Sequence, residues 1–508
     1  MMKQKNKLST IVSMPNTPLQ FDRLFVLAFS CLYLLINTAL LNLLQLFGID
    51  PFHRFFSYLL FSSWNLIIAY RIVITFAMFL PAKKLPRLSA LNTSPKVAIL
   101  YLCKDDLSLS SLERLSNIAY PLYDVFVLDD SVQSEIGPEI AHLPFYVVRR
   151  DDRRGYKAGN INNWLRLFGS VYEYFIVLDS DSKIPENFIT DMLCYAEHPS
   201  NSGIAIIQAQ LCTLTTPNLL SKYQNSMLQI QQESFSRIGN RISTVQNWGH
   251  NLLVRNSALQ HINGFNEFFI GEDVATSFDL YESGWLCRYV QVCSWEEVPH
   301  SLSAFASKHV RTTMSNLQLL LRGSWNVSLF QKLYLFMSVC PTFLIMISLP
   351  YMVYSVCHQA LSTNIPLYLF TDIASQYAGA IGLHWLLCFT LVFFDFYLYL
   401  RSGIKGLDVL WIKLSGIALT FYIVWPCLFK ILSALKGNKL TFTVTPKNHM
   451  ATSNNRLLRL LAILPIVAIV ICAVASPIVL LTNGPWILLF FAAGIQLLVI
   501  QKMDNKLP

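Results

Sequence analysis

The chain has 508 residues, of which 54% are hydrophobic and only 14% charged, with a mean hydropathy of +0.44. Soluble globular proteins have about a quarter of their residues charged, so this composition indicates a protein that lies largely in a membrane. The 11 cysteines lie singly and form no CxxC pair, which argues against a disulfide scaffold or a zinc site. The net charge of +9 is spread over loops beside apolar segments, where membrane proteins carry a cytoplasmic excess of Lys and Arg. We therefore expect no nucleic-acid partner.

Two apolar stretches near the N-terminus predict membrane-spanning helices. No charged residue lies between Arg23 and Asp50, and this stretch exceeds the ~20 residues that a helix needs to cross the hydrocarbon. It is too long for the apolar core of a signal peptide, and no small-residue cleavage site follows it. The second run, residues 55–80, contains one charged residue, Arg71. This arginine could line a polar path, but we favour the alternative that it snorkels to the membrane surface or pairs within the bundle.

The middle of the chain has the composition of one large soluble α/β domain. Apolar β-branched runs alternate with helical stretches, as in an open sheet whose carboxyl edge holds the ligand. Asp129 and Asp130 end one such run, and Asp179 and Asp181 end another. Because side chains alternate along a strand, both carboxylates of the D-x-D pattern point to the same side and can face one divalent cation bound to phosphate oxygens.

Charged residues flank the D-x-D pattern on both sides. The segment VVRRDDRRGYKAGNINNWL crowds arginines and Lys157 ahead of a helix, which suits a diphosphate or a solvated basic loop. Further on, GEDVATSFDLYESGW opens with Glu272 and Asp273, carboxylates that would also stabilise a helix N-terminus without any catalytic role.

Apolar runs return after the soluble domain, at about residues 333–356, 377–400, 457–481 and 485–500. Another run, 409–432, contains lysines and a proline. If it crossed the membrane, the basic loop after it would be separated from the large domain, so we predict an amphipathic interface helix at 409–433. The prediction is therefore six spans in three hairpins, with the large domain in the cytoplasm.

The predicted domains follow from these boundaries. They are an N-terminal tail and transmembrane hairpin (1–80), the cytosolic domain (81–331), a second transmembrane hairpin (332–400), the interface helix with its following loop (401–456), and a C-terminal transmembrane hairpin (457–508).

An ordered set of motifs resembles those of membrane-embedded, processive family 2 glycosyltransferases, specifically bacterial cellulose synthase catalytic subunits and related β-glucan synthases. The motifs are LYLCKDD, VLDDS, KAGNINN, VLDSDS, GHNLLVR, GEDVATSFDLYESGW and TFTVTPK, and the resemblance runs from about Lys96 to Lys447. It implies a cytosolic GT-A-like domain, with a nucleotide-binding open mixed sheet, inserted in a polytopic helical bundle of about six spans plus interface helices.

The resemblance assigns the donor side of the site residue by residue. It implies that Asp130, together with Asp129, contacts the nucleotide and that Lys157 binds the diphosphate. Asp179 and Asp181 would hold Mg²⁺ or Mn²⁺ together with UDP.

Asp273 takes the place of the aspartate in the family's T-E-D motif, the base that deprotonates the acceptor hydroxyl, with Gly271 in place of the threonine. The chemistry agrees with this assignment, because the departing UDP needs a metal and cations, and a hydroxyl nucleophile of high pKa needs a carboxylate base. One base suits a single in-line displacement, which gives a β-linkage from an α-linked donor.

The family's Q-x-x-R-W motif is altered here. Arg311 keeps the arginine and can meet the diphosphate, but Thr312 replaces the tryptophan on which an acceptor sugar would stack. Trp248 and His250, with Glu272, are the alternative acceptor-site residues, although a buried structural tryptophan is about as well supported.

The stretch TFTVTPK resembles the family's F-x-V-T-x-K gating loop, which implies that Thr445 and Lys447 close over the bound UDP-sugar. The motif also argues against synthases of the hyaluronan, chitin and poly-N-acetylglucosamine type.

We therefore predict a bacterial inner-membrane enzyme that transfers a sugar, glucose by resemblance, from a UDP-sugar to a growing β-glycan, with coupled export and periplasmic partner subunits. The alternatives are a non-processive transferase acting on a lipid or short acceptor, and a non-catalytic membrane scaffold or nucleotide sensor. The intact Asp179, Asp181 and Asp273 argue against the last of these.

Overall fold

The computed structural model describes most of the chain. The described residues are 17–46, 51–81, 83–132, 137–233, 237–362, 393, 396–400, 403–404, 406–436, 460, 462–463, 466–467, 470 and 491–502. The predicted spans at 377–400 and 457–481 lie mostly outside this set, and the motif TFTVTPK, with Thr445 and Lys447, lies wholly outside it.

Seven strands form one mixed sheet in the order β3-β2-β1-β4-β6-β5-β7. Their bounds are β1 Val97–Cys103, β2 Tyr123–Asp129, β3 Tyr146–Arg149, β4 Tyr174–Asp179, β5 Ile204–Thr213, β6 Leu252–Arg255 and β7 Leu286–Glu296. Strands β1 to β4 pair in parallel, β6 runs antiparallel to both β4 and β5, and β7 pairs in parallel with β5. The open mixed sheet expected from the sequence is confirmed.

The central strands form because their apolar, β-branched residues are covered on both faces of the sheet. Nearly every residue of β1, β2 and β4 is buried, as is usual for parallel strands that have helices on both sides. One hydrophobic cluster packs under α5 and the other under α4 and α8.

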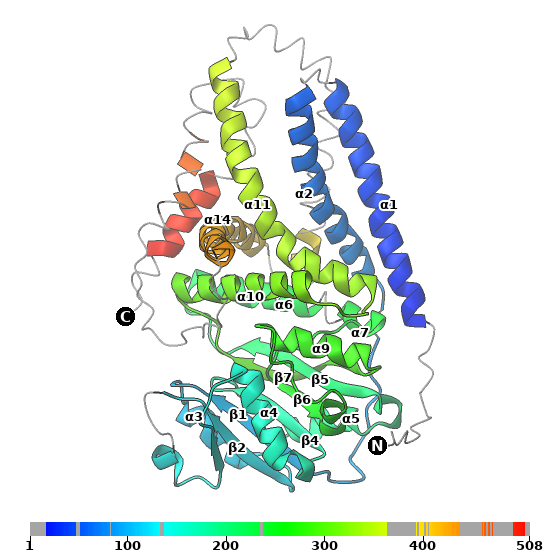
Figure 1. Ribbon diagram of the computed structural model, residues 1–508, viewed down its shortest axis with the longest axis vertical. Coiled ribbons are helices and arrows are strands. Elements are labelled where there is room, and N and C mark those ends of the chain that lie inside the picture. The colour runs from blue at the N-terminus through cyan, green and yellow to red at the C-terminus, as the bar shows by residue number, and fades with distance from the viewer. Residues whose placement is uncertain are drawn as a thin grey trace.

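Helices and short 3₁₀ turns connect the strands. The helices are α3 Leu109–Glu113, α4 Tyr156–Phe168, α5 Phe188–Ala196, α6 Leu219–Gln231, α7 Arg237–Ile242, α8 Asn256–His261, α9 Glu272–Glu282 and α10 Leu302–Arg322. The 3₁₀ turns are η1 Arg114–Asn117, η2 Gly137–Ile140, η3 Gly169–Val171 and η4 Pro199–Asn201. Figure 1 shows α10 and α6 lying across the sheet domain where it meets the long helices.

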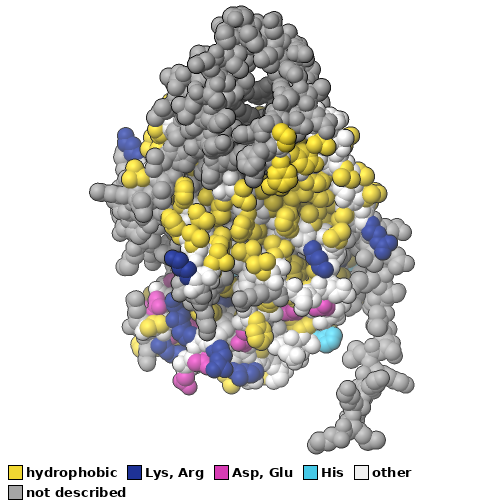
Figure 2. All heavy atoms as spheres, turned by 45° about the horizontal axis from the view of Figure 1, so that its top comes forward, with side chains coloured by type: hydrophobic (Ala, Val, Ile, Leu, Met, Phe, Trp, Pro, Cys, Tyr) yellow, Lys and Arg dark blue, Asp and Glu magenta, His cyan; other side chains and the backbone are white. Residues whose placement is uncertain are grey.

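Long apolar helices stand on the side of the domain marked by α10. They are α1 Thr17–Leu46, α2 Pro51–Met78, α11 Leu329–Ser362 and α14 Leu407–Leu435. Figure 2 shows hydrophobic side chains gathered over this part, whereas charged side chains gather over the sheet domain. On α1, for example, Leu24, Leu34 and Leu35 are all exposed. Such an exposed apolar band is typical of a lipid-facing surface.

Two of the described helices are long and apolar enough to cross a bilayer, within Arg23–Asn42 and Leu407–Leu435. Shorter apolar helical segments are Asn65–Ala77, Leu329–Leu344 and Phe491–Lys502. The described residues therefore support the predicted first span but do not confirm a bundle of six spans.

Helix α14 is the segment that the sequence analysis assigned to the membrane interface. By length and hydropathy it also qualifies as a span. Its orientation favours the interface, because Figure 1 shows α14 nearly end-on while α1, α2 and α11 run upright. Arg71 of α2 lies close enough to Tyr223 of α6 to interact with it electrostatically, so this arginine lies near the sheet domain.

Candidate active site

The register of the sheet brings the two acidic strand ends to one edge. Strand β1 lies between β2 and β4, and it pairs Cys103 with Asp129 and Leu102 with Asp179. Asp129 and Asp179 therefore lie on either side of the same central strand, at its carboxyl end. This is the edge at which open α/β sheets bind their ligands.

The acids after β2 are held by arginines of the basic segment. Asp129, with 1% of its surface exposed, accepts hydrogen bonds from the Ser131 N–H at 2.8 Å and from Arg149 Nη1 at 2.7 Å. Asp130 accepts two hydrogen bonds from the guanidinium group of Arg150, one from Nε at 2.8 Å and one from Nη2 at 2.7 Å. Two arginines that the sequence offered to a diphosphate are thus committed to carboxylates of the protein.

The cations left for an anion lie at the start of α4. The helix begins after Gly155, whose φ of +69° suits glycine, and no side chain caps it. Lys157 Nζ lies 2.6 Å from Asp179 Oδ1. Arg153 Nε is buried and has no hydrogen-bond partner among the residues that the structure describes. A helix N-terminus with these cations is suited to binding phosphate groups.

The D-x-D pattern follows β4 directly. The Asp179 N–H donates to Ser182 Oγ at 3.1 Å, and Asp181 Oδ2 accepts from the Glu297 N–H at 3.3 Å. In the described part of the chain, no group of three or more His, Cys, Asp or Glu has the geometry of a metal site. Two carboxylates fit a cation such as Mg²⁺ or Mn²⁺ that takes its other ligands from phosphate and water. That Asp179 already contacts an ammonium group shows that it can accommodate a cation.

Helix α9 brings Asp273 to the same place. A Cβ built on Gly249 would lie 3.5 Å from Asp273 Cβ and 3.7 Å from Lys157 Nζ, so both residues lie against this glycine. The Asn247 side chain holds this arrangement by donating to the Asp273 carbonyl at 2.8 Å. Asp273 and Lys157, with its partner Asp179, therefore belong to one site.

The first turn of α9 concentrates negative charge. Burial raises the pKa of Asp273, while the Val274 N–H, Lys157 and Arg311 act in the opposite direction. Burial and the neighbouring Asp273 raise the pKa of Glu272 to about 7. Glu272 can therefore hold a proton near neutral pH, beside the Asp273 carboxylate that the sequence assigns as the base. Arg311 of α10 lies near both carboxylates.

The rest of the altered motif on α10 does not provide an aromatic platform. Thr312 is exposed, and its hydroxyl donates to the Lys308 carbonyl of its own helix at 3.0 Å. Trp325 does not replace the missing tryptophan, because its ring packs on Phe278 at 5.2 Å and its Nε1 donates to Asp279 at 2.7 Å.

Helix α10 also explains the glycine before the base. A Cβ at Gly271 would come within 2.1 Å of Ser315 Oγ, so a threonine here would require Ser315 to move. The altered residue of the T-E-D motif is therefore matched by close packing against α10.

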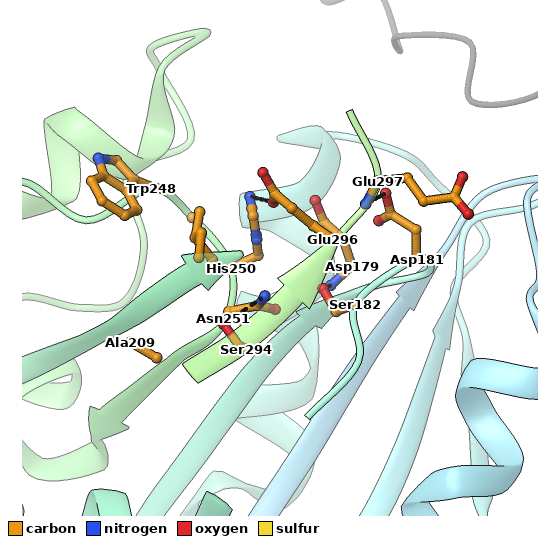
Figure 3. A network of polar contacts seen from close by, with 12 residues as sticks. Asp179, Asp181, Ser182, Ala209, Trp248, His250, Asn251, Ser294, Glu296 and Glu297 are labelled. Atoms are coloured by element: carbon orange, nitrogen blue, oxygen red, sulfur yellow. Dashed lines mark hydrogen bonds and ion pairs between the residues drawn. The ribbon is translucent and has the colours of Figure 1, made fainter. Parts of the chain in front are cut away.

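Of the residues expected on the acceptor side, Trp248 and His250 lie in the loop before β6. Trp248 has its ring centroid 6.2 Å from that of Tyr289, and Figure 3 shows it beyond His250, away from the carboxylates. This packing favours the structural interpretation of Trp248. His250 instead faces Glu296, with Nε2 3.2 Å from Oε2.

Glu296 is the residue of this site that the sequence analysis missed. Residues Lys183 and Trp295 exchange two backbone hydrogen bonds of 2.8 Å, which bring the end of β7 beside the D-x-D loop. Figure 3 shows Glu296 beside Asp179 as a result. The signal was present, since YVQVCSWEE is another β-branched run that ends in acidic residues.

A sequence model of glycosyl transferase family group 2 matches residues 174–492, more than half of the chain. The chain belongs to this family. The matched part of this family 2 glycosyltransferase starts at β4 and includes the D-x-D loop, α9 and α10. It also includes Thr445 and Lys447, which lie outside the described residues. The mixed sheet and the family together identify a GT-A-like glycosyltransferase domain.

Curated relatives are glucosyltransferases that match part of the chain. Glucans biosynthesis glucosyltransferase H from Bradyrhizobium diazoefficiens is 27% identical in an alignment of 228 residues. The alignment covers 39% of this chain and 29% of the relative. The protein of the same name from Xylella fastidiosa is 26% identical in an alignment of 221 residues. This alignment covers 39% of this chain and 34% of the relative. The matched part of the chain thus spans about a third of the length of these relatives.

Solved structures also align with this glycosyltransferase. The mannosyltransferase PcManGT from Pyrobaculum calidifontis, in complex with GDP-Man and Mn²⁺, aligns with a TM-score of 0.45 and 14% identity over 68% of this chain and 96% of that chain. TarS from S. aureus, in complex with UDP-GlcNAc, aligns with a TM-score of 0.32 and 12% identity over 70% of this chain and 97% of that chain. These scores add nothing to the family assignment.

Proposed function

We propose that the protein is an inverting membrane glycosyltransferase that transfers a hexose, with glucose as the preferred sugar, from a UDP-sugar to the end of a growing β-glycan. The observation that carries the proposal is that Asp273 and Lys157 both lie against Gly249, with Lys157 bonded to Asp179. A carboxylate base and a cation that can bind a diphosphate thus lie in one site. The printed names of the relatives, glucosyltransferases of glucan biosynthesis, support glucose and a glucan product.

The mechanism follows from the positions of these residues. Lys157 would bind the diphosphate oxygens, and Asp273 would accept the proton of the acceptor hydroxyl as this oxygen attacks the anomeric carbon. The bond to UDP breaks on the opposite face with its electron pair on the phosphate oxygen, and this single in-line displacement inverts the anomeric centre. A divalent cation held by Asp179 and Asp181 would neutralise charge on the departing UDP.

The setting that we propose is the bacterial inner membrane, with the catalytic domain in the cytoplasm. The apolar α1, the exposed hydrophobic band and the position of α10 between the sheet and the long helices support it. In this setting the helical bundle would carry the growing chain outward, towards periplasmic partner subunits. Thr445 and Lys447 would close over the bound donor.

The experiment is turnover of a panel of UDP-sugars by the purified full-length protein with Mn²⁺. We expect UDP release with UDP-glucose, loss of this activity in EDTA, and weaker Mn²⁺-dependent UDP binding in Asp179→Ala. Glu186→Ala, which removes an exposed acid close to the D-x-D loop, is the matched control and should behave as wild type. The proposal would be rejected if the protein turned over no UDP-sugar and its UDP affinity were unchanged by EDTA.

A second candidate function is the transfer of a single sugar to a lipid or short acceptor. The exposed Thr312, bonded only to its own helix among the contacts described, favours it because it offers no stacking surface. An aromatic platform would strengthen acceptor binding by ~0.5–1.5 kcal/mol, if sugar stacking resembles aromatic pairing in size. Thr312→Trp should therefore lengthen the products of a chain-building enzyme. A single-sugar product from both proteins under donor excess would leave the lipid-acceptor transferase.

A further inference from the structure

An imidazole and a carboxylate that the proposed mechanism does not use lie beside the D-x-D loop. His250 Nε2 is 3.2 Å from Glu296 Oε2, and the side chains are 17% and 11% exposed. His250 Nδ1 is buried and has no hydrogen-bond partner in the described part of the chain. The contact with Glu296 is therefore the polar interaction that orients the ring, and the ring in turn fixes the carboxylate (Figure 3).

The loop that carries His250 is clamped to the elements of the active site. On one side, the Asn247 side chain donates to the Asp273 carbonyl at 2.8 Å. On the other side, the Asn251 N–H donates to the Val177 carbonyl of β4 at 2.7 Å, and the Asn251 side chain donates to Ser294 Oγ of β7 at 3.1 Å. The loop thus joins the helix of the base, the strand that ends in the D-x-D pattern and the strand that ends in Glu296.

This clamping places the pair between the two ends of the reaction. Gly249, next to His250 in the chain, lies against both Asp273 and Lys157, and Lys157 contacts Asp179. In an in-line displacement, the transferred sugar lies between the diphosphate and the base. Glu296, beside Asp179 in Figure 3, therefore lies at the end of the site that we assign to the donor.

We propose that Glu296 binds a hydroxyl group of the transferred hexose and that His250 is the positioning residue that aims its carboxylate. This inference rests on the transfer reaction proposed above, and it moves His250 from the acceptor side to the donor side. A carboxylate is a strong acceptor for the hydrogen bond that a sugar hydroxyl donates. A buried carboxylate oxygen is also costly to leave without a partner. Such a residue selects donors by the presence and configuration of one hydroxyl.

The test uses equilibrium binding of UDP, UDP-glucose and four UDP-glucose analogues, each lacking one of the 2-, 3-, 4- or 6-hydroxyl groups. Wild type should bind one of the analogues about 10- to 100-fold more weakly than UDP-glucose, as expected for a lost hydrogen bond to a charged group. Glu296→Ala should bind UDP-glucose as weakly as wild type binds that analogue. It should lose nothing further with that analogue, and its affinity for UDP should be unchanged.

Three further variants complete the experiment. His250→Gln keeps an N–H donor for Glu296 and should retain most of the discrimination, whereas His250→Ala should lose it. Glu297→Gln is the matched control, because this neighbouring side chain is exposed and points away from His250 in Figure 3.

Equal weakening of all sugar donors by Glu296→Ala, or weakening of UDP itself, would overturn the inference and indicate a structural role for the pair. Because these measurements are of binding, they separate this result from failure of the proposed function, in which wild type would turn over no UDP-sugar.

Discussion

At the scale of single residues, Glu272 and Asp273 compete for a proton at the first turn of α9. Burial disfavours both anions, and burial together with the charge of Asp273 raises the pKa of Glu272 from 4.5 to about 7. Lys157 and Arg311 counteract this effect for both residues. Glu272 can therefore hold a proton near neutral pH, next to the carboxylate assigned as the base.

This shift makes the stability of the protein depend on pH in a defined direction. The folded state binds a proton at Glu272 more tightly than the unfolded chain, so this stabilisation is complete below pH 4.5 and is lost as the pH rises through about 7. Glu272→Gln stays neutral and should raise the Tm much more at pH 8 than at pH 5. At pH 8 the gain in unfolding free energy should be up to on the order of 3 kcal/mol. Thermal unfolding of the purified protein at both pH values measures it.

The control for this prediction is Glu186→Gln, which removes the charge of an exposed acid. It should change the Tm little at either pH. An equal shift at pH 5 and pH 8 in Glu272→Gln would show that the two states bind this proton equally.

The sequence predicted some site residues because short motifs carry them. Asp179, Asp181 and Asp273 lie in such motifs, and the structure places Asp179 and Asp273 around one lysine. The run YVQVCSWEE marks Glu296 as a strand end but does not place it at this site, because it reaches the site through the backbone pairing of Lys183 with Trp295, residues far apart in the chain. Pairing of this kind leaves no periodic trace in a sequence.

At the scale of elements, one arginine joins strand β2 to the turn before α4. Arg150 binds Asp130 through two hydrogen bonds and also donates to the carbonyls of Arg154 and Tyr156, both at 2.7 Å. The side chains of Arg150 and Asp130 are 8% and 9% exposed. The arginine therefore shapes the turn that presents Lys157 to the site.

Removing this arginine should weaken both stability and donor binding. Arg150→Ala leaves the Asp130 carboxylate buried without its partner, a change that costs about 3–5 kcal/mol for buried pairs. We expect a lower Tm and weaker UDP binding, measured by thermal unfolding and calorimetry. Arg154→Ala, from the same basic run, is the control and should be nearly neutral. An unchanged Tm in Arg150→Ala would contradict the bridging role.

Some of the strands were predicted at this scale, whereas the sequence analysis offered no strand order. Apolar β-branched runs indicate buried strands, and those that end in VLDD and VLDSD became β2 and β4. The insertion of β6, antiparallel, between β4 and β5 depends on contacts between distant residues. The commitment of Arg149 and Arg150 to carboxylates depends on the same tertiary packing, so the basic run suggested more free cations than the fold provides.

At the scale of the whole molecule, the sheet domain and the apolar helices meet along α10 and α14. Composition alone could not decide whether α14 crosses the membrane, because its length and hydropathy suit both situations. Its direction across α1, α2 and α11 in Figure 1 supports an interface helix. Such a helix would keep the segment after it on the side of the catalytic domain.

Cysteine labelling at the two ends of α14 tests this arrangement. In a background without native cysteines, Leu407→Cys and Lys436→Cys should both react with a membrane-impermeant thiol reagent only when the cytoplasmic face is open. Both positions are exposed in the structure. Arg154→Cys, on the catalytic domain, marks the cytoplasmic side. Labelling of the two ends from opposite sides would show that α14 spans the bilayer.

The central claim, a single displacement with Asp273 as the base, is tested most directly by the anomeric configuration of the product. The account predicts that the full-length protein, given UDP-glucose and Mn²⁺, forms a β-linked product that NMR and linkage-specific hydrolases identify. Asp273→Asn should still bind UDP but should form this product at least ~10²-fold more slowly, because general-base catalysis is lost. An α-linked product, or turnover near that of wild type in Asp273→Asn, would contradict the account.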